Sequence, residues 1–273
     1  DAQESRGLGD VYKRQVDNSD PFSALAFRFF LVAIGFLMYA KYKKISLKLE
    51  KRELSNSILS GVLFHGIYLG GVFYSVSLGV PTGITALIVT MQPILTNALA
   101  GPILNEKVGW RQWVGVILGF SGAAIVLGFD LGDTLPSIGI LASFIALASI
   151  TSATLLQKKF GGNTPLPVSN MYQAAGGCIF HILIVIFFAE AFINFNKTFL
   201  IAMSHQIFLV SFGAFTILMY LIKNNSASKT VTIFFLIPAT TAIIAWIFLN
   251  EELSNLDIFG FLVASFGLSL IHI

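Results

Sequence analysis

The sequence is poor in charged residues and in cysteine. Only 11% of its 273 residues are charged, whereas soluble domains average about 25%. So few charges cannot cover a water-facing surface, which argues against a soluble globular protein. The single cysteine, Cys178, excludes an internal disulfide and a cysteine-rich metal site.

Common catalytic motifs are also missing. The sequence contains no HExxH, GxSxG, GxxxxGK, GxGxxG or CxxC. No polar loop is long enough to hold a catalytic domain. We therefore predict that the protein is not an enzyme, and we assign it no catalytic residue, no cofactor and no metal. A formal charge of +3 gives no support to nucleic-acid binding.

Long apolar segments fill most of the chain, in which 55% of the residues are hydrophobic. A membrane-spanning helix needs about 20 predominantly apolar residues, because its backbone must satisfy its own hydrogen bonds in lipid. Such segments predict an all-α, polytopic membrane protein. Nine spans are expected, at residues 21–41, 57–78, 84–104, 112–129, 137–156, 168–189, 199–222, 230–249 and 256–273.

The first residues, 1–15, are polar and do not begin with methionine. We interpret them as a non-native scar and exclude them from the fold.

Basic residues gather in alternate loops. Short loops rich in Lys and Arg stay on the cytoplasmic side of a membrane. The loops between them hold Lys197 as their one basic residue and are otherwise acidic or neutral. This alternation predicts a cytoplasmic C-terminus, and we expect a bacterial inner membrane. The basic loops contain Lys41, Lys43, Lys44, Lys48, Lys51, Arg52, Lys107, Arg111, Lys158, Lys159, Lys223 and Lys229.

The second half of the sequence repeats the first at an offset of 145 residues. Residues 85–108 align with 230–253, and the shared residues include uncommon ones. An odd number of spans, five, separates the copies, so the repeats have opposite orientations in the membrane. Inverted repeats are typical of transporters that work by alternating access. The matched pairs include Thr85 and Thr230, Pro93 and Pro238, Asn105-Glu106 and Asn250-Glu251, Gly115 and Gly260, and Gly122 and Gly267.

A proline-containing helix ending in LNEK or LNEE, followed by a helix with Gly-x6-Gly, resembles the EamA-type repeat of the drug/metabolite transporter (DMT) superfamily. The segment Ser-Asp-Pro-Phe leading into Phe27-Arg28-Phe29 resembles it too. The resemblance implies two inverted five-helix repeats around a central substrate cavity. Here the first helix is expected to be missing, so that residues 16–129 hold helices two to five and residues 130–273 hold helices six to ten.

Arg28 is the clearest ionisable residue deep in a predicted span. Its insertion near a helix centre costs on the order of 2.5 to 3.5 kcal/mol. It either faces the cavity and pairs with an anionic substrate group, or bonds helix carbonyls and snorkels outward as a structural tie. His65, Tyr68 and Ser75 are expected to share one face of the next span, within about 80°, and that face is expected to look inward. His65 either relays protons or is a hydrogen-bonded packing residue.

Thr85, Gln92 and Thr96 form a narrow stripe, and Pro93 frees a backbone carbonyl at mid-membrane depth. Pro238 and Thr241 are the counterparts in the second repeat. The alternative is that both prolines are harmless kinks. Glu106 and Glu251 lie at helix ends as candidate gates or caps. The candidate cavity-lining residues are Arg28, His65, Tyr68, Gln92, Pro93, Thr96, Gln173, Tyr220, Pro238 and Thr241.

These patterns predict a secondary transporter that exports or exchanges a small metabolite, amino acid or drug-like solute, with protons as a further partner. A passive facilitator is the first alternative, because no acidic residue lies at mid-membrane depth. The second is an intramembrane enzyme that holds a lipid-linked anionic group with Arg28 and His65. The sequence does not name the substrate or the oligomeric state.

Overall fold

The computed structural model describes residues 19–128, 135–249 and 254–272. Residues 1–15, interpreted above as a scar, and Glu251 lie outside this described part. Within it the chain is helical almost throughout, and its only β pairing is an isolated bridge between Ser19 and Ile193. The prediction of an all-α membrane protein is confirmed.

Helical segments occupy the positions of all nine predicted spans. In the described residues, seven are long and apolar enough to cross a membrane, whereas Ala227–Leu236 and Asn255–Ile271 are shorter apolar helices. Their elements are α2 (Pro21–Tyr42), α3 (Lys51–Gly61), η1 (Val62–Tyr68), α4 (Leu69–Ser77), α5 (Thr82–Val89), α6 (Gln92–Leu104), α7 (Trp110–Leu127), α8 (Ser137–Phe160), α9 (Leu166–Phe188), α10 (Lys197–His205), η2 (Gln206–Ala214), α11 (Phe215–Asn224), α12 (Ala227–Thr230), η3 (Val231–Leu236), α13 (Ile237–Leu249) and α14 (Asn255–His272).

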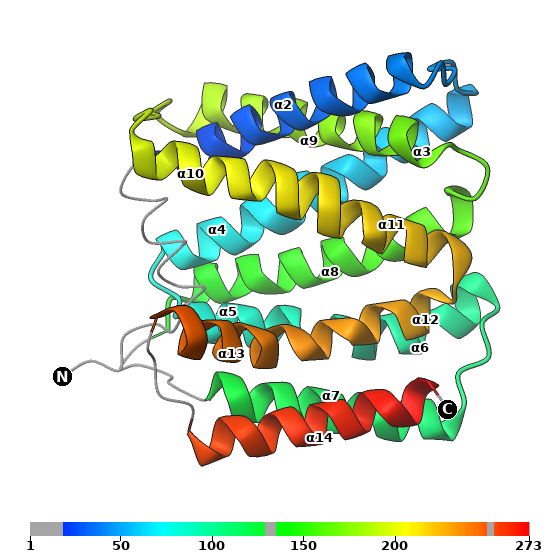
Figure 1. Ribbon diagram of the computed structural model, residues 1–273, viewed down its shortest axis with the longest axis vertical. Helices are drawn as coiled ribbons and strands as arrows, with labels where there is room; N and C mark the ends of the chain where they lie inside the picture. Colours follow the sequence, from blue (N-terminus) through cyan, green and yellow to red (C-terminus); the bar gives the residue numbers. More distant parts are fainter. Residues whose placement is uncertain (1–18, 129–134, 250–253, 273) are drawn as a thin grey trace. The chain divides into compact units, whose positions relative to one another are not determined.

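The helix bounds follow the offset of 145 residues seen in the sequence. Shifted by 145, the bounds of α2 become 166–187, next to those of α9, and the bounds of α7 become 255–272, those of α14. These related helices are also packing partners, α2 against α9 and α7 against α14 (Figure 1). The repeated sequence therefore folds into helices of matching length, and two pairs of them pack together.

The described residues form two compact units. One contains residues 74–151 and 226–272, and the other contains residues 19–73 and 152–225. Each unit combines helices from both halves of the sequence.

Two glycine pairs bring α7 and α14 into backbone contact. A Cβ atom on Gly115 would lie 2.5 Å from the carbonyl oxygen of Gly267, and one on Gly122 would lie 2.5 Å from that of Gly260. Side chains other than hydrogen cannot occupy such positions without separating the helices. The offset relates Gly115 to Gly260 and Gly122 to Gly267. Gly115 therefore contacts the counterpart of Gly122, and Gly122 contacts the counterpart of Gly115.

Four departures from α-helix interrupt the spans. Pro93 has no N–H to donate to the carbonyl of Val89, and the chain breaks between α5 and α6. In the second half, the 3-10 segment η3 ends two residues before Pro238. The π-helices η1 and η2 also correspond, because the offset carries Val62–Tyr68 onto residues 207–213, inside Gln206–Ala214. Such segments frequently mark functional sites.

Candidate functional site

Arg28 bonds to side chains of the π-helix η2. Its Nε and Nη2 atoms both donate to the hydroxyl of Ser211 at 3.0 Å, and Nη1 donates to Oε1 of Gln206 at 2.6 Å. The side chain is 7% exposed, so it does not snorkel to the surface. Ser211 and Gln206 are neutral, so these two partners orient the guanidinium without neutralising its charge.

Aromatic rings connect Arg28 with two buried histidines. The guanidinium lies 5.1 Å from the ring centroid of Phe29, and that ring lies 4.3 Å from the ring of His65. His181, on α9, stacks on Phe29 at 6.1 Å and donates from Nε2 to the backbone carbonyl of His65 at 2.7 Å. The predicted residues Arg28 and His65 are therefore brought together, through Phe29.

His65 and Ser75, which were predicted to share one face, contact different residues. Ser75 hydrogen-bonds Thr85 at 3.1 Å and Ser143 at 2.7 Å, whereas His65 packs against Phe29 and Phe215. The prediction assumed a continuous α-helix. The π-helix η1 has more residues per turn, so it rotates the later part of this span relative to the earlier part.

The three residues of the predicted polar stripe are all buried on the broken helix α5–α6. Thr85 is 1% exposed, and Gln92 and Thr96 are both 0% exposed. The hydroxyl of Thr96 has no hydrogen-bond partner. The next residue, Asn97, accepts a 2.6 Å hydrogen bond from Gln112 on α7. The stripe thus contains both satisfied groups and one hydroxyl with unused hydrogen-bonding capacity.

Other candidate residues lie in different surroundings. Gln173 is fully buried on α9, where its Nε2 donates to Gln157 at 3.2 Å and to Ser169 at 3.0 Å. Tyr68 is half-buried, whereas Tyr220 is 56% exposed on α11, away from the buried polar groups. Pro238 is buried at the start of α13, and the side chain of Thr241 lies outside the described part of the chain.

Glu106 caps the first turn of α12. Its carboxylate accepts hydrogen bonds from the backbone N–H of Ala227 at 2.7 Å and of Ser228 at 3.1 Å, and from the hydroxyl of Ser228 at 2.6 Å. Asn105 ends α6 in the left-handed region, at φ 57°, which Asn tolerates better than most residues. The Asn-Glu pair thus joins the end of one proline helix to the start of its counterpart.

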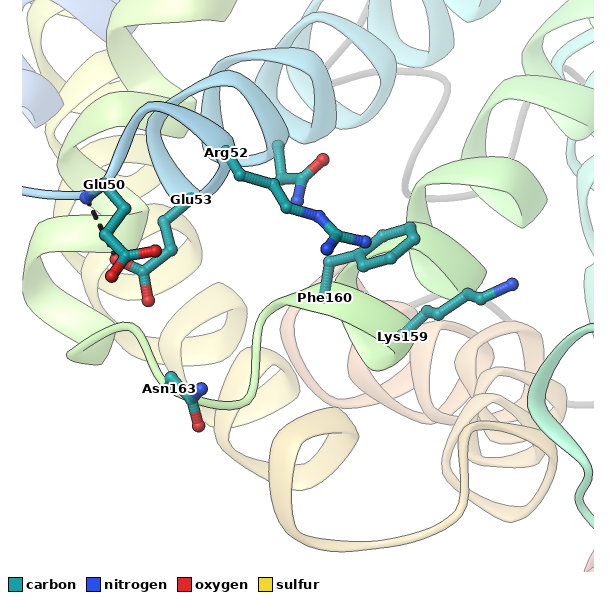
Figure 2. A pocket seen from close by; sticks show the side chains of 7 residues that line it. Glu50, Arg52, Glu53, Lys159, Phe160 and Asn163 are labelled. Atoms are coloured by element: carbon teal, nitrogen blue, oxygen red, sulfur yellow. Dashed lines mark hydrogen bonds between the residues drawn. The ribbon is translucent and has the colours of Figure 1, made fainter.

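A polar pocket of about 440 Å³ lies where α3 begins and α8 ends (Figure 2). None of its residues was among the candidates from the sequence. Arg52 and Lys159 both lie beside the ring of Phe160, with the Arg52 guanidinium carbon 5.0 Å and the Lys159 ammonium 5.7 Å from its centroid. The pocket is lined by Glu50, Arg52, Glu53, Asn56, Lys159, Phe160 and Asn163.

Sequence reasoning missed His181, Gln206 and Ser211. His181 carried a usable signal, because an ionisable residue inside an apolar span marks a functional site by default. Gln206 and Ser211 gave no such signal, because both are uncharged and only folding brings them to Arg28.

The sequence model of the EamA-like transporter family matches the chain twice, at residues 8–128 and 137–273. YvbV, an uncharacterized transporter of Bacillus subtilis, is 27% identical over 222 residues, which are 80% of this chain and 70% of that protein. The S-adenosylmethionine uptake transporter of Rickettsia prowazekii is 31% identical over 143 residues, which are 51% of this chain and 46% of that one.

The fold also matches a solved structure. One protein crystal structure superposes with a TM-score of 0.81 at 15% identity, covering 97% of this chain and 92% of that one. At this identity the likeness concerns the fold alone. The two family matches, by contrast, extend over nearly the whole chain.

Proposed function

Because this chain belongs to the EamA-like transporter family, we propose that it is a secondary transporter that exports or exchanges a small solute by alternating access. The double family match, with helix bounds that recur at one offset, carries this proposal. Two inverted repeats, residues 16–129 and 130–273, can exchange conformations and open a site to either face of the membrane in turn.

The same features support the membrane setting. The chain is an integral membrane protein with seven apolar helices of spanning length in its described residues. The basic loops support an inner-membrane location with the C-terminus in the cytoplasm.

The broken helix and its counterpart are the proposed lining of the solute path. Gln92, Pro93 and Thr96 occupy one proline helix, and Pro238 occupies the other, with Thr241 one turn further along the sequence. The unused hydroxyl of Thr96 supports this assignment, since a buried polar group without a partner is costly unless it serves another purpose. Non-helical backbone at membrane depth is tolerated where it lines such a path.

Arg28 and His65 are proposed to lie in segments that change conformation during transport. Arg28 is held by η2 and His65 lies in η1, so both are tied to π-helices at equivalent positions of the two repeats. A π-helix can convert to an α-helix, which has about one residue fewer in each turn, and this conversion rotates the helix beyond it. The rotation would exchange the groups around Arg28. Arg28 can then meet an anionic solute group, and His65 can exchange a proton.

The solute is a small polar molecule. One relative is named for S-adenosylmethionine uptake, and that compound therefore belongs in any transport panel together with amino acids and nucleosides. The match covers about half of either chain and does not identify the solute. The transport assay identifies it.

Counterflow in liposomes tests the proposal. The purified chain is reconstituted with each unlabelled solute inside, and entry of the labelled solute is measured. Transient accumulation of at least one solute is expected. An imposed pH gradient should drive accumulation above equilibrium if protons are coupled, whereas a passive facilitator would only equilibrate the solute. Absence of counterflow for the whole panel, from protein recovered intact, would contradict the proposal.

A further inference from the structure

The polar pocket at the start of α3 separates its charges into an acidic and a basic side. Figure 2 shows the carboxylates of Glu50 and Glu53 close together, with Arg52, Phe160 and Lys159 grouped apart from them. Two carboxylates and two cations give the lining a formal charge of zero. A ligand that matches this arrangement carries one anionic and one cationic group a short distance apart.

The basic side is free to bind an anion. In the described part of the chain, Arg52 and Lys159 interact only with the ring of Phe160. The guanidinium keeps five N–H donors and the ammonium keeps three. Two cations with unused donors beside the same ring fit a phosphate group, which accepts several charge-assisted hydrogen bonds at once.

The acidic side retains acceptors for an ammonium group. One oxygen of Glu53 accepts the backbone N–H of Glu50 at 3.2 Å, as part of the cap of α3. A carboxylate has about four lone-pair sites, so both side chains keep capacity for further N–H donors. A primary ammonium can donate to them, whereas a trimethylammonium group has no N–H.

The pocket lies at the end of a span, where lipid headgroups are found. The apolar segment Lys51–Ser77 begins beside it. Arg52, Asn56 and Leu59 follow one another on one face of α3, and Leu59 is 46% exposed. An acyl chain that extends from a headgroup in the pocket can therefore lie along Leu59. A soluble zwitterion would not use this apolar surface.

We propose that this pocket binds the headgroup of phosphatidylethanolamine. The phosphate lies between Arg52 and Lys159, and the ammonium lies against Glu50 and Glu53. The proposal is independent of the transported solute and of the direction of transport. It requires only that the chain spans a membrane.

Native mass spectrometry of the full chain in detergent tests this assignment. Phosphatidylethanolamine, phosphatidylglycerol and phosphatidylcholine with identical acyl chains are titrated separately, and bound lipid is counted. Phosphatidylethanolamine is expected to bind best. The double variant R52Q/K159Q should bind it about tenfold more weakly, on the scale of surface cations near phospholipid.

Two further variants make the test specific. The variant E50Q/E53Q keeps acceptors for the α3 cap but should lose the preference for phosphatidylethanolamine over phosphatidylglycerol. The control K107Q/R111Q removes the same charge, including an arginine that lies 5.7 Å from the ring of Trp110, and should bind like the parent. If R52Q/K159Q does not purify, Lys159→Gln alone, at an exposed position, tests the same contact.

Several outcomes would overturn the proposal. Preferential binding of phosphatidylglycerol would mean that the carboxylates do not select an ammonium. An equal loss of phosphatidylethanolamine binding in K107Q/R111Q would show that binding depends on net charge and not on this pocket. Equally tight binding of soluble glycerophosphoethanolamine would make the pocket a site for a free zwitterion, and unchanged binding in R52Q/K159Q would place the lipid elsewhere.

Discussion

Arg28 donates two hydrogen bonds to the hydroxyl of Ser211, from Nε and from Nη2, and both are 3.0 Å long. Residues 183 positions apart in sequence are thereby joined, one on α2 and one on η2. A single hydroxyl orients the guanidinium because this group is planar and rigid. A more flexible cation would not be held in one orientation by the same contact.

Ser211→Ala should destabilise the protein, because it removes the acceptor of two charge-assisted hydrogen bonds inside the structure. We expect a loss of about 1.5 to 3 kcal/mol in the free energy of unfolding, measured as a lower melting temperature in detergent. Ser55→Ala, at an exposed position of α3, is the control and should have no effect. An unchanged melting temperature for Ser211→Ala would show that this tie does not contribute to stability.

Glu106→Ala should loosen the first turn of α12. The substitution removes the acceptor of three hydrogen bonds and a negative charge beside a helix N-terminus. We expect a cost of about 1 to 2 kcal/mol, read from thermal unfolding, and partial recovery with Glu106→Gln. Glu190→Ala, which changes an exposed carboxylate, provides the comparison. The prediction fails if both alanine variants melt at the same temperature.

Gly122→Ala should force α7 and α14 apart. Its methyl group would lie 2.5 Å from the carbonyl oxygen of Gly260, and this contact involves backbone that cannot move aside. Overpacking of this kind costs about 1 to 3 kcal/mol, and the yield of monodisperse protein should fall with the melting temperature. A methyl at Gly162, which lies outside the helices, meets nothing within 4 Å, so Gly162→Ala should behave like the parent.

Thr96→Val separates a role in transport from a role in folding. The hydroxyl of Thr96 is buried without a hydrogen-bond partner, so the apolar replacement of similar shape should leave the melting temperature unchanged or raise it. If the hydroxyl bonds the solute, counterflow should fall about threefold to tenfold.

Thr151→Val is the matched control for Thr96→Val. The Thr151 hydroxyl is bonded to the carbonyl of Leu147 in its own helix, and this variant should transport normally. Unchanged counterflow in Thr96→Val would remove that residue from the solute path.

Several features were predictable because they depend on local sequence. Pro93 lacks an N–H wherever it is placed, so the break in its span follows from its chemistry. Glu106 was expected at a helix end, as a gate or a cap, because the predicted span ends at residue 104. The sequence related Gly115 to Gly260 and Gly122 to Gly267, although it did not show which glycine would contact which.

The surroundings of the polar residues were less predictable. The face shared by His65 and Ser75 depended on the helix type between them, and no sequence rule indicated the π-helix η1. Arg28 left two interpretations open because its partners come from a helix late in the chain. His181 was overlooked, although its place in an apolar span was a signal.

The sequence by itself determined that this protein is a helical membrane protein with a repeated half, because apolar length, charge in loops and identical residues at one offset are properties of the chain. Tertiary structure alone decided which polar groups meet. Hydrogen-bond partners such as Arg28 and Ser211 are selected by helix packing and helix type. Neither helix packing nor helix type follows from the spacing of residues along the sequence.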